Sequence, residues 1–292
     1  MEQYELDAVK RITTRPARDH RTLAVRGLTP VIGAEVTGLD LTRELTDEQL
    51  TELKTAFLDH HVLVFRDQDI SIEDHKRLAA AFGELRPVNP PPEHGDPYIL
   101  EVATAPESAT VFGNGWHADG TADEEPSLGS MLHITRMPEP GSGGDTLFAN
   151  MHLAYDMLSP KLKELLTGLT AIHDGAHAFR GHKIPAGYEP PVSEHPVVVR
   201  HPETDRPLLY VNPAYTSRIP QLSADESQAV LDLLFSVVPN RPMLACRVRW
   251  EPNTLVFWDN RCVQHHAMFD YFPHRRYGHR VTVCGDKPFY RA

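Results

Sequence analysis

The sequence predicts an α+β protein that is mainly β, in the form of a β-sandwich or jelly roll with helices on one face. Two observations predict this class. Short apolar or alternating segments, bounded by glycine and proline, recur from about residue 23 into the C-terminal third. Helical patterns with capping signals lie before and between these segments. The candidate functional residues fall on the short strands and their turns, so we expect the strands to carry the site.

The first part of the chain changes character near residue 23. Residues 1–22 are polar, arginine-rich and without a clear period, so we expect a flexible N-terminal arm followed by one domain over residues 23–292. Thr46 and Gln49 form a capping box that predicts a helix ending near His60. Strands are expected around this helix at residues 23–25, 31–36 and 62–65. A second helix is expected from Ser71 to about Phe82.

The proline-rich residues 86–97 are expected to form a loop, in the place where a lid facing the substrate would lie. Ser159 and Pro160 are typical of a helix start, and this helix is expected to stop at Gly168. A second capping box at Ser223–Glu226 opens another helix. The remaining strands are expected at residues 128–134, 147–149, 247–250, 254–258 and 277–284.

Composition excludes several classes of partner. Hydrophobic content of 41% and charged content of 24% are ordinary for a soluble globular protein. The formal charge of -11 disfavours nucleic acid and anionic membranes as partners. No apolar run approaches the roughly 20 residues of a membrane span, and the N-terminus has no signal-peptide pattern. The odd, unpatterned cysteines (Cys246, Cys262, Cys284) fit a reducing cytoplasm, and Cys262 is interpreted as a small core residue.

The chemically informative stretch is Trp116-His117-Ala118-Asp119. If it is extended, His117 and Asp119 share one face, about 7 Å apart along the strand. With one remote histidine they would form the 2-His-1-carboxylate set of non-haem Fe(II), which leaves positions for a cosubstrate and O2. Alone the pair is weak evidence in a chain with 17 histidines and 40 acidic residues. Zinc competes, but no H-E-x-x-H or C-x-x-C supports it.

Downstream residues strengthen this interpretation. His265 follows a buried strand that ends in a Trp-Asp-Asn turn, and Thr146 follows a glycine-rich turn. Arg276 and Arg280 would share one strand face, where Gly278 between them is expected to leave room for a ligand. Paired guanidinium groups bind carboxylate or sulfonate bidentately. The alternative for these arginines is a solvated basic strand.

Six short motifs occur together along the chain. They are Trp116-His117-Ala118-Asp119, Gly143-Gly144-Asp145-Thr146-Leu147, His195-Pro196-Val197-Val198, Phe257-Trp258-Asp259-Asn260-Arg261, Gln264-His265, and the segment from Arg275-Arg276 through His279-Arg280 to Gly285-Asp286-Lys287-Pro288-Phe289-Tyr290-Arg291. In combination they resemble the taurine dioxygenase (TauD/TfdA) family of Fe(II)/2-oxoglutarate-dependent oxygenases. The resemblance covers about residues 23–292 and implies a double-stranded β-helix (cupin-like jelly roll) core with flanking helices.

The resemblance implies roles for individual residues. His117, Asp119 and His265 match the iron ligands; on an extended segment His266 would point to the opposite face, so only one of the two histidines can serve. Thr146 and Arg276 match the residues that bind 2-oxoglutarate, with Arg276 on its distal carboxylate. Arg280 matches the arginine that holds the anionic end of the prime substrate.

The implied reaction uses Fe(II), 2-oxoglutarate and O2 to hydroxylate a small anionic organic substrate, giving succinate and CO2. A sulfonate, sulfate ester or aryloxyalkanoate would then undergo C–S or C–O cleavage. The alternative within the class is a hydroxylase or desaturase of a carboxylate- or phosphonate-bearing metabolite in a biosynthetic pathway. Outside it stand a non-enzymatic cupin-like metal-binding protein and, more remotely, a zinc hydrolase.

The chain departs from the taurine enzymes around the substrate. Where those enzymes carry histidine and tyrosine, this chain has Arg86 within a proline-rich loop. The family's asparagine before the first iron histidine aligns with Gly113, and Asn114 is adjacent. Arg86 and Asn114 are therefore candidate substrate contacts, although Arg86 is equally explained as a loop surface residue. Members of the family are often dimers or tetramers, so a homo-oligomer is expected.

Overall fold

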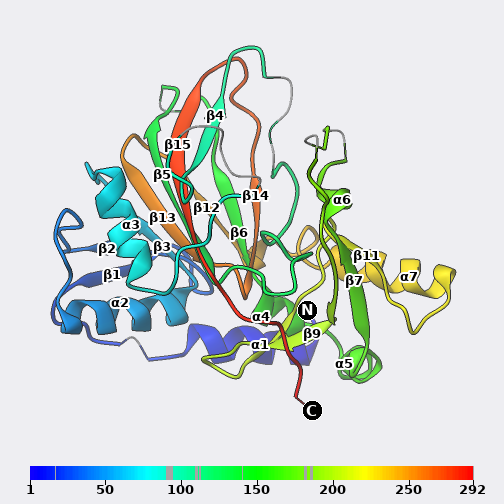
Figure 1. Ribbon diagram of the computed structural model, residues 1–292. Helices are drawn as coiled ribbons and strands as arrows, with labels where there is room; N and C mark the ends of the chain where they lie inside the picture. Colours follow the sequence, from blue (N-terminus) through cyan, green and yellow to red (C-terminus); the bar gives the residue numbers. More distant parts are fainter. Residues whose placement is uncertain are drawn as a thin grey trace.

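The computed structural model describes residues 1–292 except 17, 90–94, 109–110, 112, 140, 181–182, 185–186 and 292. It is an α+β structure with more residues in strands than in helices, as predicted (Figure 1). Part of the expected proline-rich loop, including Pro90, Pro91 and Pro92, lies outside the described residues.

The largest sheet has seven strands in the order β1-β2-β3-β13-β5-β15-β4. Its pairs are antiparallel except β2 with β3, which are parallel. Its strands are β1 (Ala24–Gly27), β2 (Ala34–Thr37), β3 (Val62–Phe65), β4 (Leu100–Thr104), β5 (Gly129–Arg136), β13 (Thr254–Asp259) and β15 (Arg276–Val283).

Three smaller antiparallel sheets complete the β structure, in the orders β12-β6-β14, β11-β7-β8 and β10-β9. The first of them carries one of the predicted metal ligands. Their strands are β6 (Thr146–Asn150), β7 (Thr170–Asp174), β8 (Val192–Pro196), β9 (Val198–Arg200), β10 (Pro207–Leu209), β11 (Thr216–Arg218), β12 (Ala245–Val248) and β14 (Val263–Ala267).

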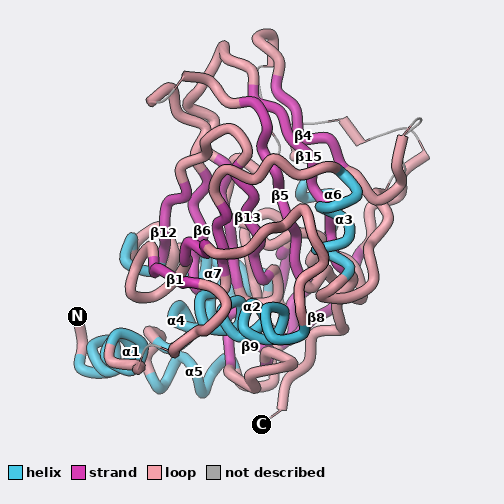
Figure 2. Tube along the Cα trace, turned by 90° about the vertical axis from the view of Figure 1, so that its left-hand side faces the viewer, coloured by secondary structure: helices cyan, strands magenta, loops and turns pink. Residues whose placement is uncertain are grey.

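In the view of Figure 2 several helices, among them α1, α4 and α5, lie toward the lower end of the molecule. Figure 1 shows α2 and α3 against one face of the large sheet, and α7 beyond β7 and β11. They are α1 (Gln3–Thr13), α2 (Asp47–His60), α3 (Ile72–Ala80), α4 (Met151–Asp156), α5 (Pro160–Leu166), α6 (Gly175–Ala178) and α7 (Ala224–Phe235), with a 3-10 turn at Pro242–Leu244.

The centre of the large sheet is buried on both faces. Along β13, Leu255 and Phe257 belong to the apolar cluster that includes Leu53 and Leu78 of α2 and α3. Val256 belongs to a second cluster, which contains Phe148 of β6 and residues of β12 and β14. Because successive side chains of a strand alternate in direction, one face of the sheet packs on helices and the other on the β12-β6-β14 sheet.

The capping signals located α2, α5 and α7 correctly. The boxes predicted at Thr46 and Ser223 form as reciprocal side-chain and backbone hydrogen bonds, and Ser159 caps α5 with Pro160 in its first turn. The helix expected from Ser71 is α3, which begins with a box of the same kind. These predictions are confirmed because capping depends on residues within one turn of each other. The buried strand expected at 62–65 is β3.

The N-terminal segment differs from the expectation of a flexible arm. Within residues 1–22, Gln3–Thr13 form α1, whose Ala8 is fully buried in the core. Glu5 makes an ion pair of 3.0 Å with Arg241. The capping box of α1 uses Glu2 as its N-cap, a residue outside the usual set, so the sequence carried no clear start signal.

Gly278 has a different role from the one predicted. The register of β15 against β5 shifts between Tyr277 and Gly278, and a Cβ on Gly278 would lie 2.2 Å from the carbonyl oxygen of His133. The absence of a side chain on Gly278 therefore makes room for the neighbouring strand at a bulge, and not for a ligand.

In the part of the chain that the structure describes, no helix has the length and apolarity needed to span a membrane.

Gly278→Ala is expected to lower the free energy of unfolding by roughly 1–3 kcal/mol, because the added methyl group collides with backbone that cannot rotate away. Urea unfolding followed by circular dichroism measures this. Gly115→Ala is the matched control, since a Cβ there meets nothing within 4 Å. Equal stability of the two variants would contradict the bulge explanation.

Candidate metal centre and cosubstrate site

Three side chains from distant segments converge on one point. His117, Asp119 and His265 place one ligand atom each within 4.8 Å of one another. Nε2 of His117 lies 3.7 Å from Oδ1 of Asp119, and Nε2 of His265 lies 3.9 Å from Oδ2 of the same carboxylate. The structure thus brings together the three residues that the sequence predicts as metal ligands.

The backbone holds the two histidines in register. The N–H of His117 donates to the carbonyl oxygen of His265 at 3.0 Å, and the N–H of His265 donates back at 2.7 Å. His265 lies on β14 opposite Phe148 of β6, whereas His117 forms only an isolated bridge and the chain then turns. The segment is therefore not the strand considered from sequence. The turn brings the carboxylate of Asp119 closer to the imidazole than a strand would.

Asn260 fixes the backbone of Asp119. Its Oδ1 accepts from the N–H of Asp119 at 2.7 Å, and its Nδ2 donates to the carbonyl oxygen of Asp119 at 2.8 Å and to Oγ of Ser127 at 3.0 Å. Asn260 is 2% exposed, so these bonds form without competition from water. The turn after β13, which begins at Asn260, thereby connects the segment of Asp119 to the strand pair that carries His265.

A buried polar network supports the turn that follows Asp119. Oγ1 of Thr121 accepts from Nδ2 of Asn212 at 3.0 Å and lies 2.9 Å from Nδ1 of His173. Nε2 of His195 lies 2.9 Å from the carbonyl oxygen of Asp123. The His195 motif thus reinforces the loop that carries Asp119.

The charges around the triad favour a deprotonated Asp119 and a neutral His265. Burial alone would raise the pKa of Asp119, but Arg280 and the two histidines reverse this and hold the pKa well below its ordinary value. Burial, followed by the neighbouring His117, lowers the pKa of His265 well below its usual range. These are the protonation states that metal ligands require.

The donor set fits a divalent transition metal. Nδ1 of His117 lies 2.8 Å from the carbonyl oxygen of Gly115, so it donates there and Nε2 keeps its lone pair toward Asp119. Nη1 of Arg280 lies 3.3 and 3.2 Å from the two oxygens of the Asp119 carboxylate, so a positive charge already lies against this carboxylate. Two imidazoles and one carboxylate form the facial set of non-haem Fe(II).

His266 belongs to a different environment from His265, as alternation predicts. Its Nε2 lies 3.1 Å from Oδ1 of Asn114, and its ring meets Trp116 edge to face. Asn114, predicted to contact substrate, is exposed and is placed at His266. Gly113 packs against the metal site itself, since a Cβ there would lie 3.0 Å from Cε1 of His117.

Arg276 is a buried cation with free hydrogen-bonding capacity. It is 4% exposed, and its Nε and Nη2 have no hydrogen-bond partner among the described residues. Burial lowers the pKa of Arg276 from its ordinary value. The guanidinium is also hydrogen-bonded to Tyr271, and the charge of Asp145 acts on it. Its two nitrogens without a partner are costly in a buried site unless an anion completes them, so they are suited to binding a carboxylate.

Trp250 joins the two residues predicted to bind 2-oxoglutarate, a role that no sequence motif indicates. Its indole Nε1 donates to Oγ1 of Thr146 at 2.9 Å, and its ring lies 5.2 Å from Cζ of Arg276. Because the indole occupies a lone pair of the Thr146 hydroxyl, the hydroxyl proton remains free to bind a carboxylate. A tryptophan next to a strand otherwise indicates only core packing.

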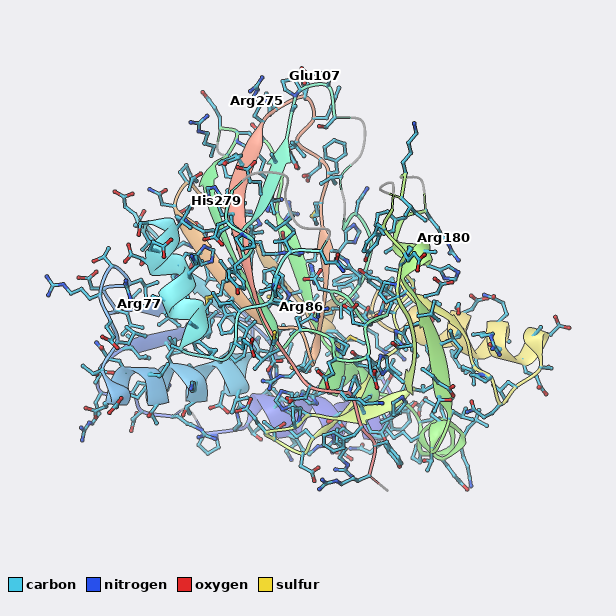
Figure 3. The ribbon with its side chains drawn as sticks, viewed as in Figure 1. Arg77, Arg86, Glu107, Arg180, Arg275 and His279 are labelled. Carbon is cyan, nitrogen blue, oxygen red and sulfur yellow. The ribbon has the colours of Figure 1, made fainter. Side chains whose placement is uncertain are left out.

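Arg86 is already paired. Its Nη2 donates to Oδ2 of Asp123 at 2.8 Å, and its Nη1 donates to the carbonyl oxygen of Glu125 at 3.2 Å. Figure 3 shows Arg86 near the lower end of β15 and Arg275 near the upper end. The ion pair favours the interpretation of Arg86 as a residue that anchors its loop.

The fold and site agree with one family. Residues 24–282 match the family model described as "Taurine catabolism dioxygenase TauD, TfdA family". This chain belongs to that family and is a 2-oxoglutarate-dependent dioxygenase.

Curated relatives are similar over most of the chain. "Alpha-ketoglutarate-dependent dioxygenase cnsP" of Penicillium expansum is 34% identical over 89% of this chain and 75% of its own length. "Alpha-ketoglutarate-dependent sulfonate dioxygenase" of Saccharomyces cerevisiae is 32% identical, over 91% and 68% respectively. "Alkylsulfatase" of Acinetobacter baylyi is 31% identical, over 94% and 89%.

Solved structures are similar as well. A protein from Burkholderia xenovorans, described as a putative alpha-ketoglutarate-dependent taurine dioxygenase, superposes with a TM-score of 0.80 at 35% identity, over 91% of this chain and 94% of that chain. The structure of AAD-2 with Mn(II) and N-oxalylglycine superposes with a TM-score of 0.78 at 27% identity, over 92% and 100%.

His265→Ala is expected to abolish binding of Mn(II) or Fe(II), whereas His266→Ala is expected to retain it. Of these two imidazoles, only that of His265 faces Asp119. The two substitutions remove the same chemical group from the same strand. Electron paramagnetic resonance of free Mn(II) in a titration measures the difference. The reverse pattern would exchange the two assignments.

Trp250→Phe is expected to raise the KM for 2-oxoglutarate by roughly 2- to 10-fold, the effect of one neutral hydrogen bond. The ring stays beneath Arg276, but the Thr146 hydroxyl is no longer oriented. The KM for the prime substrate should hardly change. Steady-state kinetics with each substrate varied in turn measure this split, and a loss confined to kcat would contradict the role.

Proposed function

We propose that this dioxygenase uses Fe(II) bound by His117, Asp119 and His265, with 2-oxoglutarate and O2, to hydroxylate a small anionic organic compound. The observation that carries the proposal is the convergence of these three donors beside two arginines on one face of β15, each with unfilled hydrogen-bonding capacity. The substrate class proposed is a sulfonate, sulfate ester or aryloxyalkanoate, with C–S or C–O cleavage after hydroxylation.

The protein's part in the reaction is to bind and orient. When bound, the iron would supply the oxygen activation that couples decarboxylation of 2-oxoglutarate to oxidation of a substrate C–H bond. Arg276 and Thr146 would hold the distal carboxylate of 2-oxoglutarate, and Trp250 would hold both of them. Asn260 would keep the Asp119 backbone in place.

Arg280 is proposed to hold the anionic group of the prime substrate. Its Nε is buried without a hydrogen-bond partner in the described parts of the chain, and its Nη1 contacts Asp119. A metal ion that takes over the Asp119 carboxylate would release this guanidinium for another anion. The substrate then binds next to the metal, as hydroxylation requires.

The substrate is proposed to differ from taurine. The left-handed backbone of Gly113 and its close approach to His117 leave no space for the asparagine side chain of the taurine enzymes. Arg86, paired with Asp123, replaces a direct substrate contact of those enzymes. The named activities of the relatives, which include a sulfonate dioxygenase and an alkylsulfatase, support an anionic substrate.

The finer fold assignment follows the same reasoning. We infer that the large sheet and the β12-β6-β14 sheet, with the metal ligands at their common end, form the double-stranded β-helix core expected from the sequence. The apolar cluster shared by the two sheets supports this inference.

The deciding experiment is anaerobic titration of the metal-free protein with Fe(II) and 2-oxoglutarate, followed by visible absorbance. A weak charge-transfer band is expected from the chelate. Perturbation of this band then screens sulfonates, sulfate esters, aryloxy acids and phosphonates. Release of sulfite, sulfate or a phenol separates bond cleavage from the alternative, in which a stable alcohol or alkene forms. Absence of the band in folded, iron-loaded protein would overturn the proposal.

The two arginines are expected to separate kinetically. Arg276→Gln should raise the KM for 2-oxoglutarate by roughly 10- to 100-fold, because a charged bidentate contact contributes about 1.5–3 kcal/mol. Arg280→Gln should weaken the prime substrate while leaving 2-oxoglutarate affinity nearly intact. Arg275→Gln, at a neighbouring exposed position, is the matched control for both. An exchange of the two effects would exchange the roles.

A further inference from the structure

A second group of metal-ligating side chains lies outside the dioxygenase site. One ligand atom each of His61, His152 and Cys262 lies within 4.8 Å of the others. The three residues are at most 2% exposed. They come from three separate elements: the C-terminus of α2, helix α4, and the turn between β13 and β14.

The imidazoles of this group are free to bind a cation. Nδ1 of His152 lies 2.8 Å from the carbonyl oxygen of Pro207, so it donates there and Nε2 carries the lone pair. This Nε2 and Nδ1 of His61 have no hydrogen-bond partner in the described residues. Burial lowers the pKa of His152 to about 3 and that of His61 well below its ordinary value, so both rings are neutral.

The adjacent His201 and Asp259 are not available as ligands. Nε2 of His201 lies 3.0 Å from Oδ2 of Asp259, and its Nδ1 accepts from the backbone of residues 203 and 204. Both oxygens of Asp259 also accept from Arg261. Hydrogen bonds therefore satisfy this pair without a metal, in contrast to His61 and His152.

We propose that His61, His152 and Cys262 bind one monovalent copper ion, in a structural site separate from the dioxygenase centre. Thiolate and imidazole are the ligands that a soft d10 ion prefers. Binding replaces the thiol proton of Cys262, which leaves to solvent, so the ion and the thiolate together are neutral. Neutrality matters because the complex would lie in the apolar core.

Charge and coordination number select copper over zinc. Structural zinc takes four ligands, and the nearby Asp259 carboxylate is fully occupied. A divalent ion would also leave a net positive charge in the core. Arg206 opposes that charge, since its own positive charge acts on all three side chains. A neutral copper–thiolate unit avoids this repulsion.

The backbone at His61 adds a second argument. His61 ends α2 in the left-handed conformation, with φ of 64°, where glycine is the residue without strain. Its imidazole is placed in the core despite that preference. His61→Gly therefore removes the ligand while relieving the backbone, so this variant is expected to fold.

The test is a titration of the anaerobic full-length protein with Cu(I), in competition with the chromophoric chelator bicinchoninate. One equivalent of Cu(I) is expected to resist the chelator. His61→Gly and Cys262→Ser should each weaken binding by more than the ~10–100-fold that loss of a mere supporting group causes. Cys284→Ser, which removes a thiol outside the cluster, should bind as the wild type does.

X-ray absorption at the copper edge identifies the ligands directly. One sulfur and two nitrogen neighbours are expected in the wild type, and the dioxygenase triad offers no sulfur. Copper binding that His61→Gly leaves unchanged would overturn the proposal. So would a wild type that binds no chelator-resistant copper, or that binds zinc in its place.

Discussion

The structure of the site depends on the reciprocal backbone hydrogen bonds between His117 and His265, 3.0 and 2.7 Å long. Side-chain geometry alone could not keep residues so far apart in sequence at ligand distance, because loss of rotamer freedom would oppose it. The bridge gives the two imidazoles a common frame. The side-chain amide of Asn260 then fixes Asp119 to that frame by bonding the backbone of Asp119 and not its carboxylate. The carboxylate is therefore left free for a cation.

The polar atoms around the triad differ in whether they have hydrogen-bond partners. The polar atoms that hold the frame are satisfied, whereas several atoms of the two arginines are not: Nε of Arg280, and Nε and Nη2 of Arg276 have no partner in the described structure. Unpaired buried groups each cost free energy, and these three atoms belong to cations. Stability is thus lowered where ligands would bind, while the centre of the large sheet is packed on both faces.

Local signals were sufficient for α2, α3, α5 and α7 and for strands such as β3, β5 and β13, but not for α1. Capping boxes and the short H-x-D spacing are read within a few residues, whereas the roles proposed for Thr146, Arg276 and Arg280 came from the resemblance. The sequence could not show that Trp250 binds Thr146 and underlies Arg276, because that arrangement arises only when β12 packs beside β6. It also could not show that Gly278 serves a bulge, or that Asp123 neutralises Arg86, since both depend on strand register and loop packing.

Formal charge provides a final argument about the proposed substrate. With Fe(II) and the dianion of 2-oxoglutarate bound, the iron charge and the cosubstrate charge cancel. Asp119 then offsets one of the two arginines, and the other remains as a single uncompensated positive charge. In a buried site that charge is most favourably matched by one negative charge, as in a sulfonate, a sulfate monoester or a carboxylate. A neutral substrate would leave Arg280 unpaired, and a dianion would leave its own second charge without a partner. The electrostatics of the site therefore favour a monoanionic substrate.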